Sequence, residues 1–253
     1  MMLDEDIYLP DGLPVAYIKS INTLVVSDLH LGYEGMMAKR GMLIPKVNLR
    51  SIEDIITKSA EETGAESIIV NGDIKNEFSN VETEEFNEML DLIRMAERIG
   101  LRMTLIKGNH DNFVDRYREA FHLEIHSQSA NIGDYMFIHG ERRPVIRGRP
   151  RMMIMGHEHP AISITNEAGV RERLRCFLFG SYKGIPLLVL PAMNYFAGST
   201  DINMADRDEL LSPVLGGVNV DAMHAIAIGY GSTIDFGTIS DLRRAGPRAM
   251  AGL

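Results

Sequence analysis

The chain has 253 residues, of which 45% are hydrophobic and 24% are charged, and its formal net charge is -9. This length suits one large α/β domain or two small ones, and the negative charge excludes a surface that attracts nucleic acid as a whole. The single cysteine, Cys176, excludes an internal disulfide, is expected to be a small core residue, and fits a reducing cytoplasm. No apolar run approaches the roughly 18 residues of a membrane span, and the acidic N-terminus lacks a signal peptide's features, so we expect a cytoplasmic protein without membrane segments.

The first half of the chain alternates short apolar runs with helical patterns. Strands are predicted at residues 23–27, 67–70 and 103–106, each a short apolar or β-branched run. Helices are predicted at residues 47–63 and 84–99, where apolar residues recur at helical spacing and a glycine follows the last turn. This order predicts parallel strands joined by right-handed crossovers.

The second half, from about residue 125, is predicted to be mostly β-structure. Hairpins are predicted over residues 127–138, 161–178 and 225–236, and single strands at 151–155 and 187–190. Together the two halves predict one α/β domain over residues 1–241, in which two mixed sheets pack face to face with helices outside, a four-layer α-β-β-α sandwich. The last residues, 242–253, are predicted to form a loose tail.

A pair of histidines follows the apolar run 152–155, in Gly156-His157-Glu158-His159. Two positions apart along extended backbone, His157 and His159 would point to one face about 6–7 Å apart. That spacing suits two adjacent metal ions better than one, and Glu158 between them is expected to face solvent. Taken alone, the stretch could equally be a pair of surface histidines at a turn.

Four more predicted strands end in residues that bind metals, which favours the metal interpretation. Ligands of open α/β sheets bind at the carboxyl ends of the strands, and carboxylate, imidazole and amide oxygen suit divalent manganese, iron or zinc. Two sites that share one carboxylate need about seven protein ligands, and seven are present besides His110. The candidates are Asp28, His30, Asp73, Asn109, His110, His139, His157 and His159.

In this order, the strand-end motifs resemble those of the calcineurin-like metallophosphoesterase superfamily. They stand here as Asp28-Leu29-His30, Gly72-Asp73, Gly108-Asn109-His110-Asp111, His139-Gly140 and Gly156-His157-Glu158-His159. The resemblance runs from about residue 23 to residue 160 and implies the metallophosphoesterase fold. Residues 27–34 and 72–78 look closest to archaeal phosphoesterases related to the double-strand-break repair nucleases, and to a ligase-associated bacterial relative.

The resemblance also implies a function, namely a hydrolase that cleaves a phosphomonoester or phosphodiester through a hydroxide bridging two divalent ions. Manganese is the expected metal, with iron, zinc and nickel as alternatives. The first ion would be held by Asp28, His30 and His159 and the second by Asn109, His139 and His157, with Asp73 bridging the two.

The motif that follows the third predicted strand would supply the acid. His110 would protonate or stabilise the leaving group. Asp111 would orient His110 or the backbone, a role that we weigh equally against that of an ordinary turn aspartate.

Candidate substrate contacts lie beside these motifs. Arg142 and Arg143 follow His139 in an arginine-rich stretch, and Asn76 follows the bridging aspartate. Guanidinium groups grip phosphate, although solvated arginines that balance an acidic surface are the alternative. The related nucleases carry a histidine where this chain has Asn76 and add a long DNA-contacting region, so a nucleic-acid substrate is a weaker alternative to a small phosphate ester. A non-catalytic binding module on the same fold is a further alternative, but such modules lose ligand histidines and this chain retains them.

Overall fold

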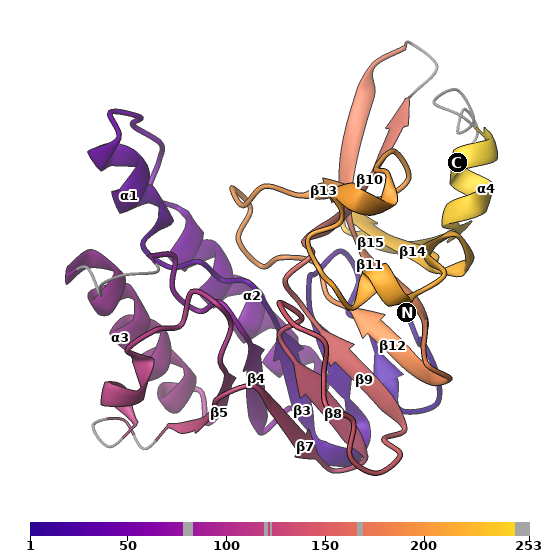
Figure 1. Ribbon diagram of the computed structural model, residues 1–253. Coiled ribbons are helices and arrows are strands. Elements are labelled where there is room, and N and C mark those ends of the chain that lie inside the picture. Colours follow the sequence, from indigo (N-terminus) through magenta and orange to yellow (C-terminus); the bar gives the residue numbers. More distant parts are fainter. Residues whose placement is uncertain (78–82, 119–120, 122, 166–168, 246–253) are drawn as a thin grey trace.

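The computed structural model describes residues 1–77, 83–118, 121, 123–165 and 169–245 (Figure 1). Two sheets face each other and form the centre of the molecule. The first has six strands in the order β1-β2-β3-β4-β5-β6, and the second has nine strands, seven of them in the order β13-β10-β11-β12-β9-β8-β7. The predicted α/β fold of two mixed sheets with helices outside is confirmed.

The first sheet is parallel where the sequence predicts crossovers. Strands β3, β4, β5 and β6 run parallel, while β1 and β2 add an antiparallel edge beside β3. The strands are β1 (Ile7–Tyr8), β2 (Ala16–Ile18), β3 (Thr23–Val26), β4 (Ser67–Asn71), β5 (Arg102–Ile106) and β6 (Glu124–His126). The helices are α1 (Tyr33–Lys39), α2 (Asn48–Thr63) and α3 (Thr83–Arg98).

Both faces of the first sheet are buried, which explains why its strands are continuously apolar. Val25 and Ile69 point into the core between the two sheets. Their neighbours along β3 and β4 pack on the opposite side, in a core to which α2 and α3 contribute their apolar faces. These neighbours are Leu24, Val26, Ile68 and Val70.

The second sheet has a parallel centre, because β9 pairs in parallel with both β8 and β12. Off the main path, β14 pairs with β11 and β15 pairs with β14. The strands are β7 (Ser129–Ile132), β8 (Tyr135–Ile138), β9 (Met152–Met155), β10 (Pro160–Thr165), β11 (Arg171–Tyr182), β12 (Ile185–Val189), β13 (Thr200–Asp201), β14 (His224–Gly229) and β15 (Ser232–Thr238). Cys176 is fully buried in β11, as predicted.

The outer face of the second sheet is covered by one short helix, α4 (Ile239–Ala245), and by short 3-10 segments. Leu242 of α4 is buried in this outer core, so the prediction that a loose tail starts at residue 242 is wrong for residues 242–245. The rest of that predicted tail, 246–253, lies outside the described residues. None of the helices in the described part of the chain combines the length and apolar character that a bilayer span needs.

The elements of the first half that escaped prediction include β1, β2 and α1. Strands β1 and β2 have two and three residues, too few for an alternation to be visible. Helix α1 has seven residues, and its Glu34 accepts hydrogen bonds from the backbone N–H groups of Val47 and Asn48 at 3.2 and 2.8 Å. Glu34 therefore satisfies free donors at the start of α2, and α1 is held by a contact that is distant in the sequence.

Candidate metal centre

The predicted ligands all follow strands at the edge shared by the two sheets. Asp28 and His30 follow β3, Asp73 follows β4 and Asn109 follows β5, while His139 follows β8 and the pair His157 and His159 follows β9. Backbone hydrogen bonds join these segments in pairs. The N–H of Asp28 donates to Gly72 at 3.0 Å, and the N–H of Gly156 donates to His139 at 2.9 Å.

Five of the ligands adopt backbone conformations that ordinary residues avoid. Their φ angles are +58° at Asp28, +45° at His30, +50° at Asp73, +69° at His157 and +48° at His159. Such left-handed residues cost about 1–3 kcal/mol each and concentrate at functional sites. The prediction of extended backbone at the histidine pair is therefore wrong, although both rings reach the site.

Two clusters of ligand atoms result. In the first, Nε2 of His159 lies 3.2 Å from Oδ1 of Asp28 and 3.3 Å from Nε2 of His30. In the second, Nε2 of His139 lies 3.2 Å from Oδ2 of Asp73 and 3.2 Å from Nδ1 of His157. Two ligands of one ion with bonds of roughly 2.1 Å lie about 3.4 Å apart in tetrahedral geometry, so these separations fit a shared ion.

Asp73 and Asn109 complete the pattern. Asp73 belongs to the second cluster and also to a third group with His30 and His110, so its carboxylate reaches both clusters. Oδ1 of Asn109 is buried and has no hydrogen-bond partner among the described residues. A buried amide oxygen without a partner is unfavourable in a protein interior, and a metal ion would satisfy it. The residues present therefore fit two divalent ions.

Glycines in three motifs make room for ligands that come from elsewhere in the chain. A Cβ at Gly72 would lie 2.0 Å from Nδ1 of His139, and one at Gly108 would lie 2.1 Å from Oδ1 of Asp73. A Cβ at Gly156 would lie 2.7 Å from Oδ2 of Asp28 and 1.8 Å from Oγ of the neighbouring Ser27. Each motif glycine is thus required because another segment approaches its backbone closely.

Backbone carbonyls orient two of the ligand rings. Nδ1 of His139 donates to the carbonyl of Asn71 at 3.2 Å, and Nδ1 of His159 donates to that of Gly198 at 2.8 Å. In both rings Nε2 is left facing the cluster, which is how protein surroundings usually set the tautomer of a metal-binding histidine. Asn71 and Gly198 were not predicted to support the site.

The electrostatics of the centre lower the pKa of two ligand histidines and raise the pKa of two others. Burial, reinforced by neighbouring imidazoles, lowers the pKa of His30 and that of His157 to about 4. Burial also opposes charge on His139, but the carboxylates of Asp73 and Asp28 outweigh it and raise its pKa to about 10. The pKa of His159 is raised in the same way, chiefly by Asp28. Protons and metal ions therefore compete for these two rings.

His110 lies at the edge of the centre. Its Nε2 is 3.8 Å from Oδ2 of Asp73, its side chain is 18% exposed, and its Nδ1 donates to the carbonyl of Asn76. Asn76, which was predicted to contact substrate, therefore holds the ring of His110 through its backbone carbonyl. The predicted acid faces the carboxylate that reaches both clusters and is partly open to solvent.

Asp111 is fully buried and binds the backbone. Its carboxylate accepts hydrogen bonds from the N–H groups of Gly108 at 2.8 Å and Lys75 at 3.3 Å. Burial and the nearby carboxylate of Asp73 raise its pKa to about 7. Asp111 thus joins the segments after β4 and β5, and its role in positioning His110 stays a prediction.

The prediction that Glu158 faces solvent is wrong. Its side chain is fully buried and accepts hydrogen bonds from the N–H groups of Leu211 at 3.1 Å and Ser212 at 2.8 Å. Asn194, which was not predicted, is also buried. Its N–H donates to Asp28 at 3.1 Å, and its side chain donates to the carbonyl of His30 at 3.3 Å. Its position just after β12 resembles that of the ligands and could have signalled it.

The two arginines predicted to contact substrate are exposed. Arg142 donates to the neighbouring Glu141 at 2.8 Å, and Arg143 donates to the carbonyl of Pro213 at 3.4 Å. Both follow His139 within four residues. Their contact with substrate stays a prediction.

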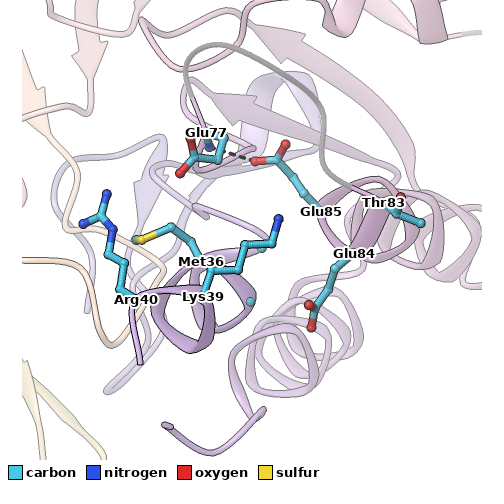
Figure 2. A pocket seen from close by; sticks show the side chains of 9 residues that line it. Met36, Lys39, Arg40, Glu77, Thr83, Glu84 and Glu85 are labelled. Carbon is cyan, nitrogen blue, oxygen red and sulfur yellow. Dashed lines mark hydrogen bonds between the residues drawn. The ribbon is translucent and has the colours of Figure 1, made fainter. Parts of the chain in front are cut away.

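A separate hollow of about 510 Å³ lies between α1 and the start of α3 (Figure 2). Glu77 and Glu85 meet in it, where the backbone N–H of Glu77 donates to Oε1 of Glu85 at 2.8 Å. Its lining residues are Gly32, Gly35, Met36, Lys39, Arg40, Glu77, Thr83, Glu84 and Glu85. None of these is a predicted metal ligand, so the hollow is distinct from the metal centre.

Comparison with solved structures supports the fold. The nuclease MPE of Pseudomonas putida aligns with a TM-score of 0.62 at 18% identity, covering 90% of this chain and 94% of that one. YfcE, a phosphoesterase from E. coli, aligns with a TM-score of 0.44 at 14% identity, covering 85% of this chain and 98% of that one. At such identities only the first likeness carries weight, and it concerns the fold alone. No curated protein sequence matches the chain.

A family model supplies the stronger evidence. Residues 21–148, half of the chain, match the model described as Calcineurin-like phosphoesterase. The matched segment contains the motifs from Asp28 to His139, whose side chains converge on the two clusters. The finer likeness to archaeal relatives of repair nucleases stays a prediction. The chain belongs to the calcineurin-like phosphoesterase family and is a metal-dependent hydrolase.

Proposed function

We propose that this protein hydrolyses a phosphomonoester or phosphodiester with two divalent metal ions, manganese being the expected metal. The first ion would be held by Asp28, His30 and His159. The second would be held by Asn109, His139 and His157, and Asp73 would contact both. The observation that carries the proposal is the pair of clusters, each with three ligand atoms within 4.8 Å of one another, joined through Asp73.

The metal ions, when bound, would supply positive charge to the phosphate oxygens and make water a better nucleophile. The protein supplies orientation and a proton. Because Nδ1 of His110 donates to the carbonyl of Asn76, its Nε2 is directed toward the side of the centre where Asp73 lies. A protonated His110 can donate the Nε2 proton to the oxygen that leaves phosphorus.

Asp111 would act through the backbone. It holds Gly108 and Lys75, which flank the segments carrying His110 and Asp73. This bridging contact would keep the acid and the shared carboxylate in register.

Two features favour an enzyme over a non-catalytic binding module. All seven predicted ligands are present, and five of them adopt strained backbone conformations. Strained backbone of this kind concentrates at functional sites. We further propose that residues 1–245, with α4 included, act as one domain and that the protein resides in the cytoplasm, where a single buried thiol needs no partner.

The test combines metal analysis with hydrolysis of a generic aryl phosphate ester. The manganese-loaded chain should bind two ions and hydrolyse the ester. His110→Ala should retain both ions but lower turnover by about 10²- to 10⁴-fold. His224→Ala is the control, because this exposed histidine pairs with Asp235 outside the centre and should change neither measurement. Failure of the loaded wild type to hydrolyse any phosphate ester would refute the proposal.

A further inference from the structure

An aromatic group lies on the loop between β12 and β13, which extends from the second sheet toward α1 and α2 (Figure 1). Phe196 stacks on Tyr33 at the start of α1, with ring centroids 6.3 Å apart and planes 5° apart. Tyr195 meets Phe196 edge to face at 5.8 Å, yet 73% of Tyr195 is exposed. The Phe196–Tyr33 stack therefore anchors the loop across the two halves of the fold, and Tyr195 projects from it.

The same loop touches the metal centre on both sides of Tyr195. Before it, Asn194 donates its N–H to the carbonyl of Asp28 at 3.1 Å. After it, the carbonyl of Gly198 accepts from Nδ1 of His159 at 2.8 Å. Three residues of extended chain span about 10 Å. Tyr195 therefore lies within about 10 Å of Gly198, which orients the metal ligand His159.

A cation supports the ring of Tyr195. The guanidinium carbon of Arg175 lies 5.6 Å from the ring centroid. One guanidinium nitrogen donates to the carbonyls of Ala192 at 2.9 Å and Met193 at 3.3 Å. Arg175 is thereby fixed against the loop, and the tyrosine ring is oriented before any ligand arrives.

Arg175 differs in its ion pairing from the two other arginines on the same strand face. Arg171 and Arg173 both pair with Asp201, at 2.9 and 2.6 Å. No carboxylate among the described residues lies within ion-pair distance of Arg175. An oriented cation without an anionic partner, beside an exposed aromatic ring, is complementary to a nucleotide, which joins a flat base to a phosphate.

We propose that Tyr195, supported by Arg175, stacks on a nucleobase of the substrate, and that the substrate is a single-stranded nucleic acid. The inference rests on the proposed phosphoesterase function and adds its substrate class. Stacking needs a base that is free of its own neighbours, which a single strand offers. With a formal net charge of -9, the surface as a whole does not attract nucleic acid, so we expect base stacking to contribute to binding beside the phosphate contacts.

The experiment compares two oligomers that differ only in the base. One is a single-stranded oligonucleotide, and the other has the same length but carries abasic sugars. The manganese-loaded wild type should prefer the first in kcat/KM by about 5- to 150-fold, the range that one base–aromatic stack provides. Tyr195→Ala should bring this ratio close to one, whereas Tyr195→Phe should keep it because the ring remains.

Tyr230→Ala is the matched control, since Tyr230 is 87% exposed but lies in the turn between β14 and β15, and it should keep the wild-type ratio. A second readout uses a fluorescent 2-aminopurine base in the oligonucleotide, bound to the slow variant His110→Ala. Its fluorescence should be quenched on binding, and adding Tyr195→Ala should abolish the quenching.

The outcomes separate the two proposals. A wild-type ratio near one, or a ratio that Tyr195→Ala leaves unchanged, would overturn the stacking role while hydrolysis of the aryl ester continued to support the phosphoesterase. Loss of the aryl ester activity in every protein, wild type included, would overturn the phosphoesterase itself and with it this inference.

Discussion

Replacing Gly72 by alanine tests whether the motif glycines exist to admit ligands from other segments. The new Cβ would lie 2.0 Å from Nδ1 and 2.4 Å from Cγ of His139, well inside contact distance. Gly72 also has a φ of +95°, which strains any other residue. Two penalties therefore combine at this position, and only the clash concerns the metal centre.

Gly100→Ala separates these penalties. Gly100 follows α3 with a φ of +81°, and a Cβ there would meet nothing within 4 Å. The free energy of unfolding of this control should fall only by the cost of a left-handed backbone at alanine, about 1–2 kcal/mol. Gly72→Ala should lose a further 1–3 kcal/mol, roughly, because overpacking displaces a buried ring, and its manganese affinity should fall by at least about 10-fold.

The two variants are compared by urea unfolding of the metal-free proteins and by calorimetric titration with manganese. The unfolding data give the two free energies, and the titrations show whether the ring of His139 still reaches its ion. Equal destabilisation of both variants, together with wild-type affinity in Gly72→Ala, would refute the reasoning.

Three further predictions concern the pH dependence of metal affinity, the pH dependence of stability, and the last helix. Since the raised pKa of His139, about 10, keeps this ring protonated at pH 7 in the metal-free protein, manganese must displace its proton, and the apparent affinity for manganese should rise about tenfold per pH unit for that proton. The raised pKa of His139 also stabilises the metal-free protein fully below its ordinary pKa of 6.5, and this stabilisation should be lost as the pH rises toward 10. Calorimetric titration with manganese between about pH 6.5 and pH 10 checks the rise in affinity, and urea unfolding over the same range checks the loss of stability. An affinity for manganese that does not change with pH would contradict the first prediction. Leu242→Ala should destabilise the protein by about 2–5 kcal/mol in urea unfolding, whereas the exposed Arg244→Ala should change stability little, and equal effects would mean that α4 contributes no packing.

The metal centre combines chemistry that is readable from residue type with geometry that is not. The ligands could be predicted because each stands just after a buried strand, and the ends of neighbouring strands meet at one edge. The conformations of His157 and His159 could not be predicted, since local sequence favours no left-handed backbone at a non-glycine residue. Those conformations persist only because the surrounding fold enforces them.

The sequence by itself determined the strands β3, β4, β5, β8 and β9, the helices α2 and α3, and the set of ligands, because hydrophobic periodicity and motif spacing are properties of contiguous residues. Only the tertiary structure decided that Glu158 is buried, that Asp111 holds backbone, and that Arg175 supports Tyr195. Each of these depends on a partner far along the chain, as Glu158 depends on Ser212, 54 residues away. Contacts of that kind arise when the sheets pack, and no local pattern encodes them.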